Sequence, residues 1–279
     1  MQTVILGMCA GYAVPQIEMF AKTCREFYSG RVVLFLSNCA DDVEPYLRSL
    51  GIETVDAGPL KKPALDRFYR WHDFLLNDTG IERCLMTDVR DVLFQADPFA
   101  GFEEDELRFF EEPISISANS PNRSWIQSIY GERQAQELET KSVICCGTII
   151  ASRKGALTYL QQFLAEVDRV RPLPWGTDQA VTIKLIYSGA FPQATIVKNG
   201  CGEVQTLARQ ERFVFNARGN LLNADGTKPA IVHQYDRHDF LVRHFDMTPR
   251  DLRKFKKLEK SRSAAFKHLI NVTMSKGLG

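Results

Sequence analysis

The sequence predicts an α/β fold with a central, mostly parallel sheet and helices on both of its faces. Short apolar runs, typical of buried strands, alternate with segments of helical apolar spacing through the first 90 residues. Strands that alternate with helices in this way form parallel sheets flanked by helices. With 279 residues, 44% of them hydrophobic, the chain can bury one large core without disulfides.

The first half of the chain follows the order β-α-β-α-β-α-β. The first expected helix, for example, places Ile17, Phe20 and Cys24 on one face. Ligands of parallel sheets bind at the carboxyl ends of the strands, so the backbone after Met8 and the turn at Asp88 should share one rim. The expected strands are residues 4–8, 32–36, 52–55 and 83–88, and the expected helices are residues 15–27, 43–50 and 63–77.

The second half is less regular, because strand-like and helical runs no longer alternate one for one. A basic helical extension should end the chain, which divides it into a domain over residues 1–245 and an extension over residues 246–279. The expected strands are residues 113–118, 142–152 with a break at Gly147, 194–197 and 229–233, and the expected helices are residues 124–136, 155–170 and 177–188.

Composition excludes several classes of protein. The net charge of +1, from 35 basic and 34 acidic residues, gives no global field that would attract nucleic acid. No run of 18 apolar residues occurs, so no membrane-spanning helix is expected. The first basic residue is Lys22, which does not fit a secretory signal. The seven cysteines lack a Cys-x-x-Cys spacing and fit buried free thiols in a reducing, cytoplasmic setting.

The strongest chemical signal is a pair of carboxylates, Asp88 and Asp91, at the end of the fourth strand. Carboxylate oxygens suit hard cations, and Mg²⁺ in proteins commonly joins one or two carboxylates to the phosphates of a substrate. The pair therefore indicates a diphosphate site at the rim. The alternative is a helix N-terminus, with Asp88 as its cap and Asp91 in its first turn. Spacing alone leaves both interpretations open.

Three other places carry chemistry and also have a structural explanation. His233 ends an expected strand, where a neutral imidazole can bind a metal or simply hydrogen-bond within the fold. Asp178 and Gln179 begin an expected helix, where they can hold sugar hydroxyls or cap the helix. Cys145 and Cys146 lie in an apolar run, which favours buried structural thiols over redox chemistry.

These signals occur in the order found in a known family. Residues 85–99 resemble the Asp-x-Asp region of GT-A glycosyltransferases, above all the retaining families 8 and 77. Residues 146–150 resemble the strand beside the donor sugar, Asp178 and Gln179 resemble the Asp-Gln pair at that sugar, and His233 resembles the late metal-binding histidine. The resemblance covers about residues 3–245 and implies a Rossmann-like GT-A domain.

The acidic motif departs from the family pattern by one residue. The usual Asp-x-Asp is replaced by Asp88-Val89-Arg90-Asp91. Counting back from Asp97 aligns Asp91 with the second, metal-binding aspartate and puts Val89 where the first belongs. Asp91 is therefore the expected metal ligand, and Asp88 is expected to substitute for the first aspartate or to contact ribose or a bound water.

The resemblance implies a hexosyl- or pentosyltransferase that uses Mn²⁺ or Mg²⁺ and a nucleotide-sugar donor, above all a UDP-sugar. It implies retention of configuration and a glycan, a lipid-linked molecule or a protein as acceptor. Asp91 and His233, joined by Asp88, would hold the metal, and Asp178 and Gln179 would face the anomeric carbon. The implied donor-binding positions are Met8, Cys9, Ala10, Tyr12, Arg67, Arg70, Asp88, Cys146 and Gly147.

Several alternatives stay open at this point. Arg67 and Arg70 fit solvent-facing positions on their helix as well as contacts with phosphate, and Trp125 fits either the core or the acceptor side. A nucleotidyltransferase on a related fold is one competing function, although residues 7–11 lack the lysine of a phosphate-binding loop. A non-catalytic nucleotide-sugar-binding protein is another. The basic extension fits peripheral contact with the inner face of a membrane, or an exposed amphipathic helix that packs on its own domain.

Overall fold

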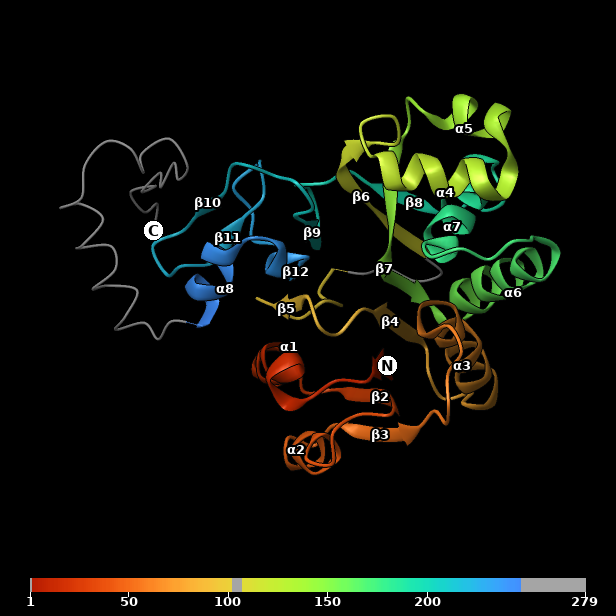
Figure 1. Cartoon of the computed structure of the whole chain (residues 1–279). Coiled ribbons are helices and arrows are strands. Elements are labelled where there is room, and N and C mark those ends of the chain that lie inside the picture. Colours follow the sequence, from red (N-terminus) through yellow and green to blue (C-terminus); the bar gives the residue numbers. More distant parts are fainter. Residues whose placement is uncertain (1, 102–106, 247–279) are drawn as a thin grey trace.

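The computed structural model describes residues 2–101 and 107–246, which form a seven-stranded sheet between two layers of helices (Figure 1). The strand order is β3-β2-β1-β4-β7-β6-β8. Strands β3, β2, β1 and β4 run parallel, β7 is antiparallel to both of its neighbours, and β8 is parallel to β6. The predicted α/β class with a mixed, mostly parallel sheet is confirmed. The strands are β1 (Thr3–Ala10), β2 (Arg31–Ser37), β3 (Glu53–Asp56), β4 (Arg83–Thr87), β6 (Leu107–Ser115), β7 (Ser142–Ser152) and β8 (Thr195–Val197).

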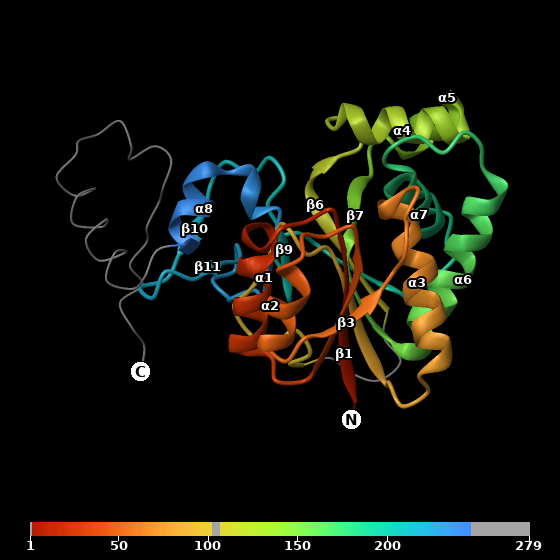
Figure 2. The same cartoon turned by 60° about the horizontal axis from the view of Figure 1, so that its bottom comes forward.

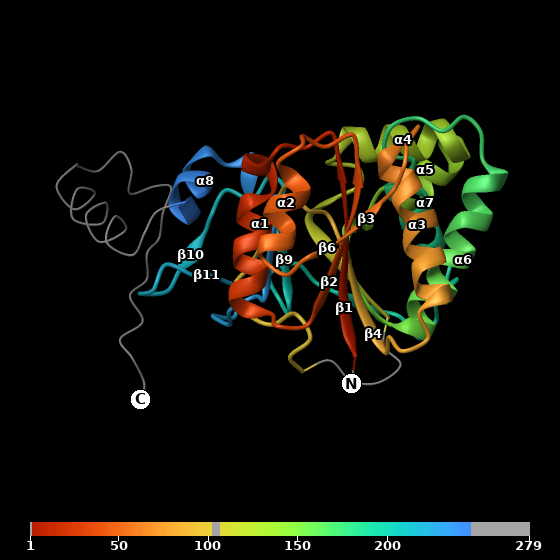
Figure 3. The ribbon, with the colours of Figure 1, turned by 90° about the horizontal axis from the view of Figure 1, so that it is seen from below.

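Helices cover the two faces of the sheet separately (Figures 2 and 3). Helices α1 and α2 lie on one face, and α3, α6 and α7 lie on the other. Side chains of β1 alternate accordingly, since Leu6 and Met8 join the core under α3 and α6, whereas Ile5 and Cys9 join the core under α1. The helices are α1 (Val14–Phe27), α2 (Val43–Ser49), α3 (Pro63–Asn77), α4 (Ser120–Tyr130), α5 (Glu132–Leu138), α6 (Arg153–Arg169), α7 (Thr177–Tyr187) and α8 (Asp239–Asp246).

The order of the strands reverses beside β1. The chain runs outward from β1 to β2 and β3, and then returns to place β4 on the other side of β1. Ligands of open α/β sheets bind outside the carboxyl ends of the strands at such a reversal. Gly7 allows close packing here, because a Cβ atom on it would lie only 2.6 Å from Cγ2 of Val89 in the loop after β4.

Shorter strands bring the last described part of the chain back to this rim. Strand β12 lies between β5, to which it is antiparallel, and β9, to which it is parallel. This small sheet and the β10–β11 hairpin share a separate apolar cluster with α8, at the left of Figure 1. The elements are β5 (Val92–Phe94), β9 (Val204–Thr206), β10 (Val214–Phe215), β11 (Leu221–Leu222), β12 (Ile231–His233) and the 3₁₀ turn Tyr235–Arg237.

Two predicted elements of the second half are wrong in their bounds. The strand expected at residues 113–118 is β6, which begins at Leu107 and buries Phe109 and Phe110 before the expected start. The helix expected at residues 124–136 is two helices, α4 and α5, separated by Gly131. The φ of Gly131 is +87°, a conformation that only glycine adopts without steric cost, so the helix ends there.

The break expected at Gly147 is a bulge on one side of a continuous strand. Strand β7 pairs with β4 from Thr148 onward without interruption. On its other edge, Phe109 of β6 lies opposite Ile149 while the next residue, Phe110, lies opposite Cys145. The three residues between them have no partner on β6. Bulges of this kind bend a strand and redirect its side chains, often beside active sites.

The predicted C-terminal extension over residues 246–279 lies, from residue 247 onward, outside the described residues. The predicted domain boundary at residue 245 falls within α8. Within residues 2–101 and 107–246, no helix combines the length and the apolar character needed to cross a bilayer.

Candidate metal centre and its cavity

Strand pairing brings His233 to the loop between Asp88 and Asp91. Asp88 directly follows β4, and Asp91 directly precedes β5. Strand β5 pairs with β12 so that Val92 lies opposite His233, and the N–H of Gln234 donates to the carbonyl of Asp91 at 2.7 Å. The β5–β12 ladder therefore fixes the distance between residues that are far apart in the sequence.

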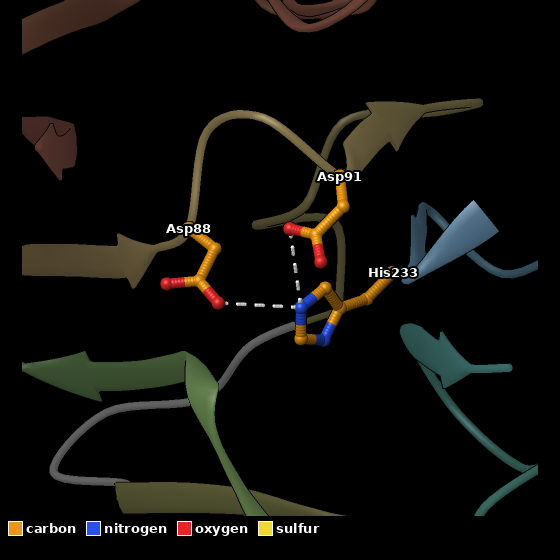
Figure 4. A group of neighbouring side chains, drawn as sticks. All are labelled: Asp88, Asp91 and His233. Atoms are coloured by element: carbon orange, nitrogen blue, oxygen red, sulfur yellow. Dashed lines mark ion pairs between the residues drawn. The ribbon is translucent and has the colours of Figure 1, made fainter. Parts of the chain in front are cut away.

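The three side chains point toward one another (Figure 4). Nε2 of His233 lies 3.4 Å from Oδ2 of Asp88 and 3.6 Å from Oδ1 of Asp91. His233 is 1% exposed and Asp91 is 8% exposed, while the side chain of Asp88 is 31% exposed and opens the group to the cavity. One ligand atom from each residue lies within 4.8 Å of the others, which is close enough for the three to bind a metal ion.

Two observations fit a cation at this position. Nε2 of His233 is buried and has no hydrogen-bond partner, although buried polar atoms are rarely left unpaired. Gly147 leaves the adjoining space open, since a Cβ atom there would lie 2.3 Å from Oδ2 of Asp88 and 2.7 Å from Cε1 of His233. The N–H of Asp88 also donates to the carbonyl of Gly147 at 2.7 Å, which holds the carboxylate beside this space.

Neighbouring charged groups shift the pKa values of His233 and Asp88. Burial alone would lower the pKa of His233, but Cys145 and the carboxylates of Asp91 and Asp88 outweigh burial and raise this pKa. Burial would raise the pKa of Asp88, but Arg67 and His233 outweigh it and lower this pKa well below its usual range. A metal at Nε2 must displace the proton that the carboxylates favour there, so metal binding should weaken as the pH falls.

Arg67 connects the metal centre to the start of α7. Its guanidinium pairs with Asp88 and, at 3.1 Å, with Asp178, and it lies over the rings of Phe68 and Trp71 at 5.0 and 5.3 Å. Burial opposes its charge, but the two carboxylates and Cys146 raise the pKa of Arg67. Arg67 is therefore neither solvent-facing nor free for phosphate, because two carboxylates already occupy it.

The wall of the site opposite the metal centre is formed by the start of α7. Gly176 caps this helix with a φ of +80°, and Asp178 accepts from the thiol of Cys146 at 3.3 Å. Gln179 donates to Glu112 of β6 at 3.0 Å. Glu112 is buried, which raises its pKa although nearby groups oppose the shift. Sequence reasoning missed Glu112, because it follows Glu111 in a locally acidic run that fits a solvated surface.

These groups surround a cavity of about 410 Å³, within the range of ligand-binding sites. Its lining includes eleven of the predicted site residues: Met8, Ala10, Tyr12, Arg67, Asp88, Asp91, Cys146, Gly147, Asp178, Gln179 and His233.

Two predicted site residues lie outside this lining. Cys9 is fully buried on the α1 side of the sheet. Arg70 donates to the carbonyl of Ala57 at 2.8 Å and does not reach the cavity. Alternate residues of β1 point to opposite faces, which explains why Met8 and Ala10 line the cavity and Cys9 does not.

The lining also includes residues that were not predicted, among them Trp175, Arg90 and Arg237. Trp175 is 77% exposed, and the guanidinium of Arg90 pairs with Asp236 at 3.2 Å. Trp125, which the sequence left between core and acceptor side, also lines the cavity and packs under Gly176, where a Cβ atom would lie 2.1 Å from its ring. An exposed indole and two arginines give this cavity aromatic and cationic surfaces beside the acidic centre.

No protein-family model matches this chain, and no curated protein matches it.

Proposed function

We propose that the protein is a divalent-metal-dependent glycosyltransferase of the GT-A type that transfers a sugar from a nucleotide-sugar, such as a UDP-sugar, to an acceptor. The observation that carries the proposal is the convergence of Asp88, Asp91 and His233 at the strand-order reversal beside β1. The reversal is where α/β sheets bind nucleotides, and the two carboxylates with an imidazole are ligands that suit Mn²⁺ or Mg²⁺.

The proposed reaction assigns a role to each part of the cavity. Asp88, Asp91 and His233 would hold the cation, which supplies neutralisation of the charge on the departing diphosphate. Arg237 and Arg90 also line the cavity and would add positive charge for the phosphates. The backbone of Met8, Ala10 and Tyr12, at the end of β1, would hold the nucleoside.

The sugar would lie between the metal centre and the start of α7. Cys146, Gly147, Asp178 and Gln179 line that side of the cavity. In the reaction, the bond from the anomeric carbon to the diphosphate oxygen would break, a bond to an acceptor oxygen would form, and the acceptor proton would pass to the departing diphosphate. Arg67, which pairs with Asp178 at 3.1 Å, would hold this side chain in position beside the anomeric carbon. Trp175, at the α7 end of the cavity, is positioned to contact the acceptor.

The test is thermal unfolding with UDP-, GDP- and CMP-sugars, each with and without Mn²⁺. A ligand at about 100 times its dissociation constant adds about 2.7 kcal/mol to the free energy of unfolding. We expect one nucleotide class to raise the melting temperature of the wild type by several degrees only when Mn²⁺ is present, and Asp91→Ala to remove this shift.

The matched control is Asp73→Ala, which removes a carboxylate that is 66% exposed on α3 and remote from the cavity lining. This variant should keep the full shift. A shift that persists in Asp91→Ala, or one that does not depend on Mn²⁺, would reject the metal-dependent transferase. A shift with free nucleoside triphosphates and none with nucleotide sugars would favour a nucleotidyltransferase.

A further inference from the structure

Cys145 lies against the side of the His233 ring that faces away from the carboxylates. Its Sγ is 3.2 Å from Nδ1 of His233, and both side chains are about 1% exposed. Nδ1 of the ring therefore contacts the sulfur of Cys145, and Nε2 is directed at Asp88 and Asp91. A histidine can bind a cation through Nε2 only when the single proton of the neutral ring is on Nδ1.

The other contacts of this sulfur show that it receives hydrogen bonds. The backbone N–H of Gly147 donates to Sγ of Cys145 at 3.3 Å, and the hydroxyl of Thr148 lies 4.0 Å from it. Both residues belong to the bulge of β7, the three residues that have no partner on β6. A sulfur that accepts from the bulge is suited to accept from Nδ1–H of His233 as well.

The neighbouring cysteine has a different environment. Cys146 points to the opposite face of β7, where its thiol donates to Asp178 at 3.3 Å and lies 3.7 Å from the guanidinium of Arg67. Of the two adjacent cysteines, Cys145 alone contacts the histidine among the described residues. The two adjacent thiols therefore have different partners, His233 for Cys145 and Asp178 for Cys146.

We infer that Cys145 is a positioning residue of the metal centre: its sulfur accepts the Nδ1 proton of His233 and so keeps the lone pair of Nε2 toward Asp88 and Asp91. The inference rests on the metal binding that the proposed function requires. A metal-binding histidine usually donates its other ring N–H to a carboxylate or a backbone carbonyl, and here a thiol would be the acceptor. Removing such partners typically weakens metal binding about 10–100-fold.

The experiment measures the dissociation constant of Mn²⁺ alone, from the electron paramagnetic resonance signal of the free ion, for wild type and variants. Cys145→Ala should weaken binding about 10–100-fold. Cys145→Ser should restore most of it, because a hydroxyl can also accept from Nδ1–H. The control is Cys84→Ala, which removes an equally buried thiol of β4 away from the site and should bind Mn²⁺ as the wild type does.

A second readout reports the tautomer directly. The chain has five histidines, so ¹⁵N-labelled imidazole resonances can be assigned by substitution. With Mg²⁺ bound, His233 of the wild type should carry its proton on Nδ1, and Cys145→Ala should show a mixture of tautomers. Unchanged Mn²⁺ affinity in Cys145→Ala, or a proton on Nε2 in the Mg²⁺-bound wild type, would overturn the inference about Cys145. A wild type that binds no Mn²⁺ would instead overturn the metal centre, and with it the proposed function.

Discussion

Arg67→Met is expected to lower the free energy of unfolding by about 3–5 kcal/mol, because it removes one partner of a buried ionic group and leaves the other charged. Arg67 and Asp178 are each only 7% exposed, so little water can replace the lost guanidinium. A loss of this size is a large part of the roughly 5–15 kcal/mol that stabilises a typical domain. Denaturant unfolding followed by circular dichroism measures it.

The matched control is Arg48→Met, whose side chain is 66% exposed and pairs with Glu44 one turn earlier in α2. Exposed pairs of this kind contribute about 0.3–0.5 kcal/mol. Adding Asp178→Asn to Arg67→Met should recover part of the stability, since the uncompensated charge is then gone. Equal losses for Arg67→Met and Arg48→Met would mean that the buried network does not carry the energy assigned to it. If Arg67→Met does not fold, Arg67→Lys, which keeps the positive charge, is measured in its place.

Gly147→Ala is expected to abolish metal binding while most of the fold survives. The added methyl group would lie 2.3 Å from Oδ2 of Asp88 and 2.7 Å from Cε1 of His233, so one of these ligands must move. Overpacking of this kind typically costs about 1–3 kcal/mol of stability. The loss of Mn²⁺ affinity should equal or exceed the roughly 10–100-fold seen when residues around a metal centre are altered. Mn²⁺ titration and the melting temperature measure the two effects separately.

Gly80→Ala is the control for the added methyl group. Its Cβ atom would lie 2.7 Å from the flexible end of the Gln2 side chain and at ordinary contact distance, 3.5 Å, from Oδ1 of Asp78, and none of these residues lines the cavity. It should bind Mn²⁺ normally. If Gly147→Ala also binds Mn²⁺ normally, the cation is not held in the space between Asp88 and His233.

The first half of the fold could be predicted from sequence because each element there has a strong local pattern. Strands β1, β2 and β4 are almost wholly buried and therefore uniformly apolar, and α1 and α3 have one clear apolar face. Strands β5, β9 and β12 have three residues each, and β10 and β11 have two. Segments that short are defined by their partners across the sheet rather than by any periodicity along the chain.

The site could be predicted only in part for the same reason. Asp88 and Asp91 are neighbours, so their pairing is visible in the sequence. Whether His233 joins them depends on the β5–β12 ladder, and the resemblance to a known family supplied that link where spacing could not. The position of Arg67 was left open, because helical spacing does not distinguish an arginine at the surface from one buried between two carboxylates. Glu112 was missed, since carboxylates are seldom buried on strands.

The β5–β12 ladder has a consequence for the order in which the protein matures during synthesis. The β1–β4 half of the sheet, with Asp88 at its rim, is complete once about the first 90 residues have left the ribosome. The third ligand arrives only with residue 233, when a pairing of high sequence separation closes. Such contacts form late, because a long loop must be ordered before they contribute. The nascent chain should therefore complete the β1–β4 part of the sheet well before the three candidate metal ligands can come together.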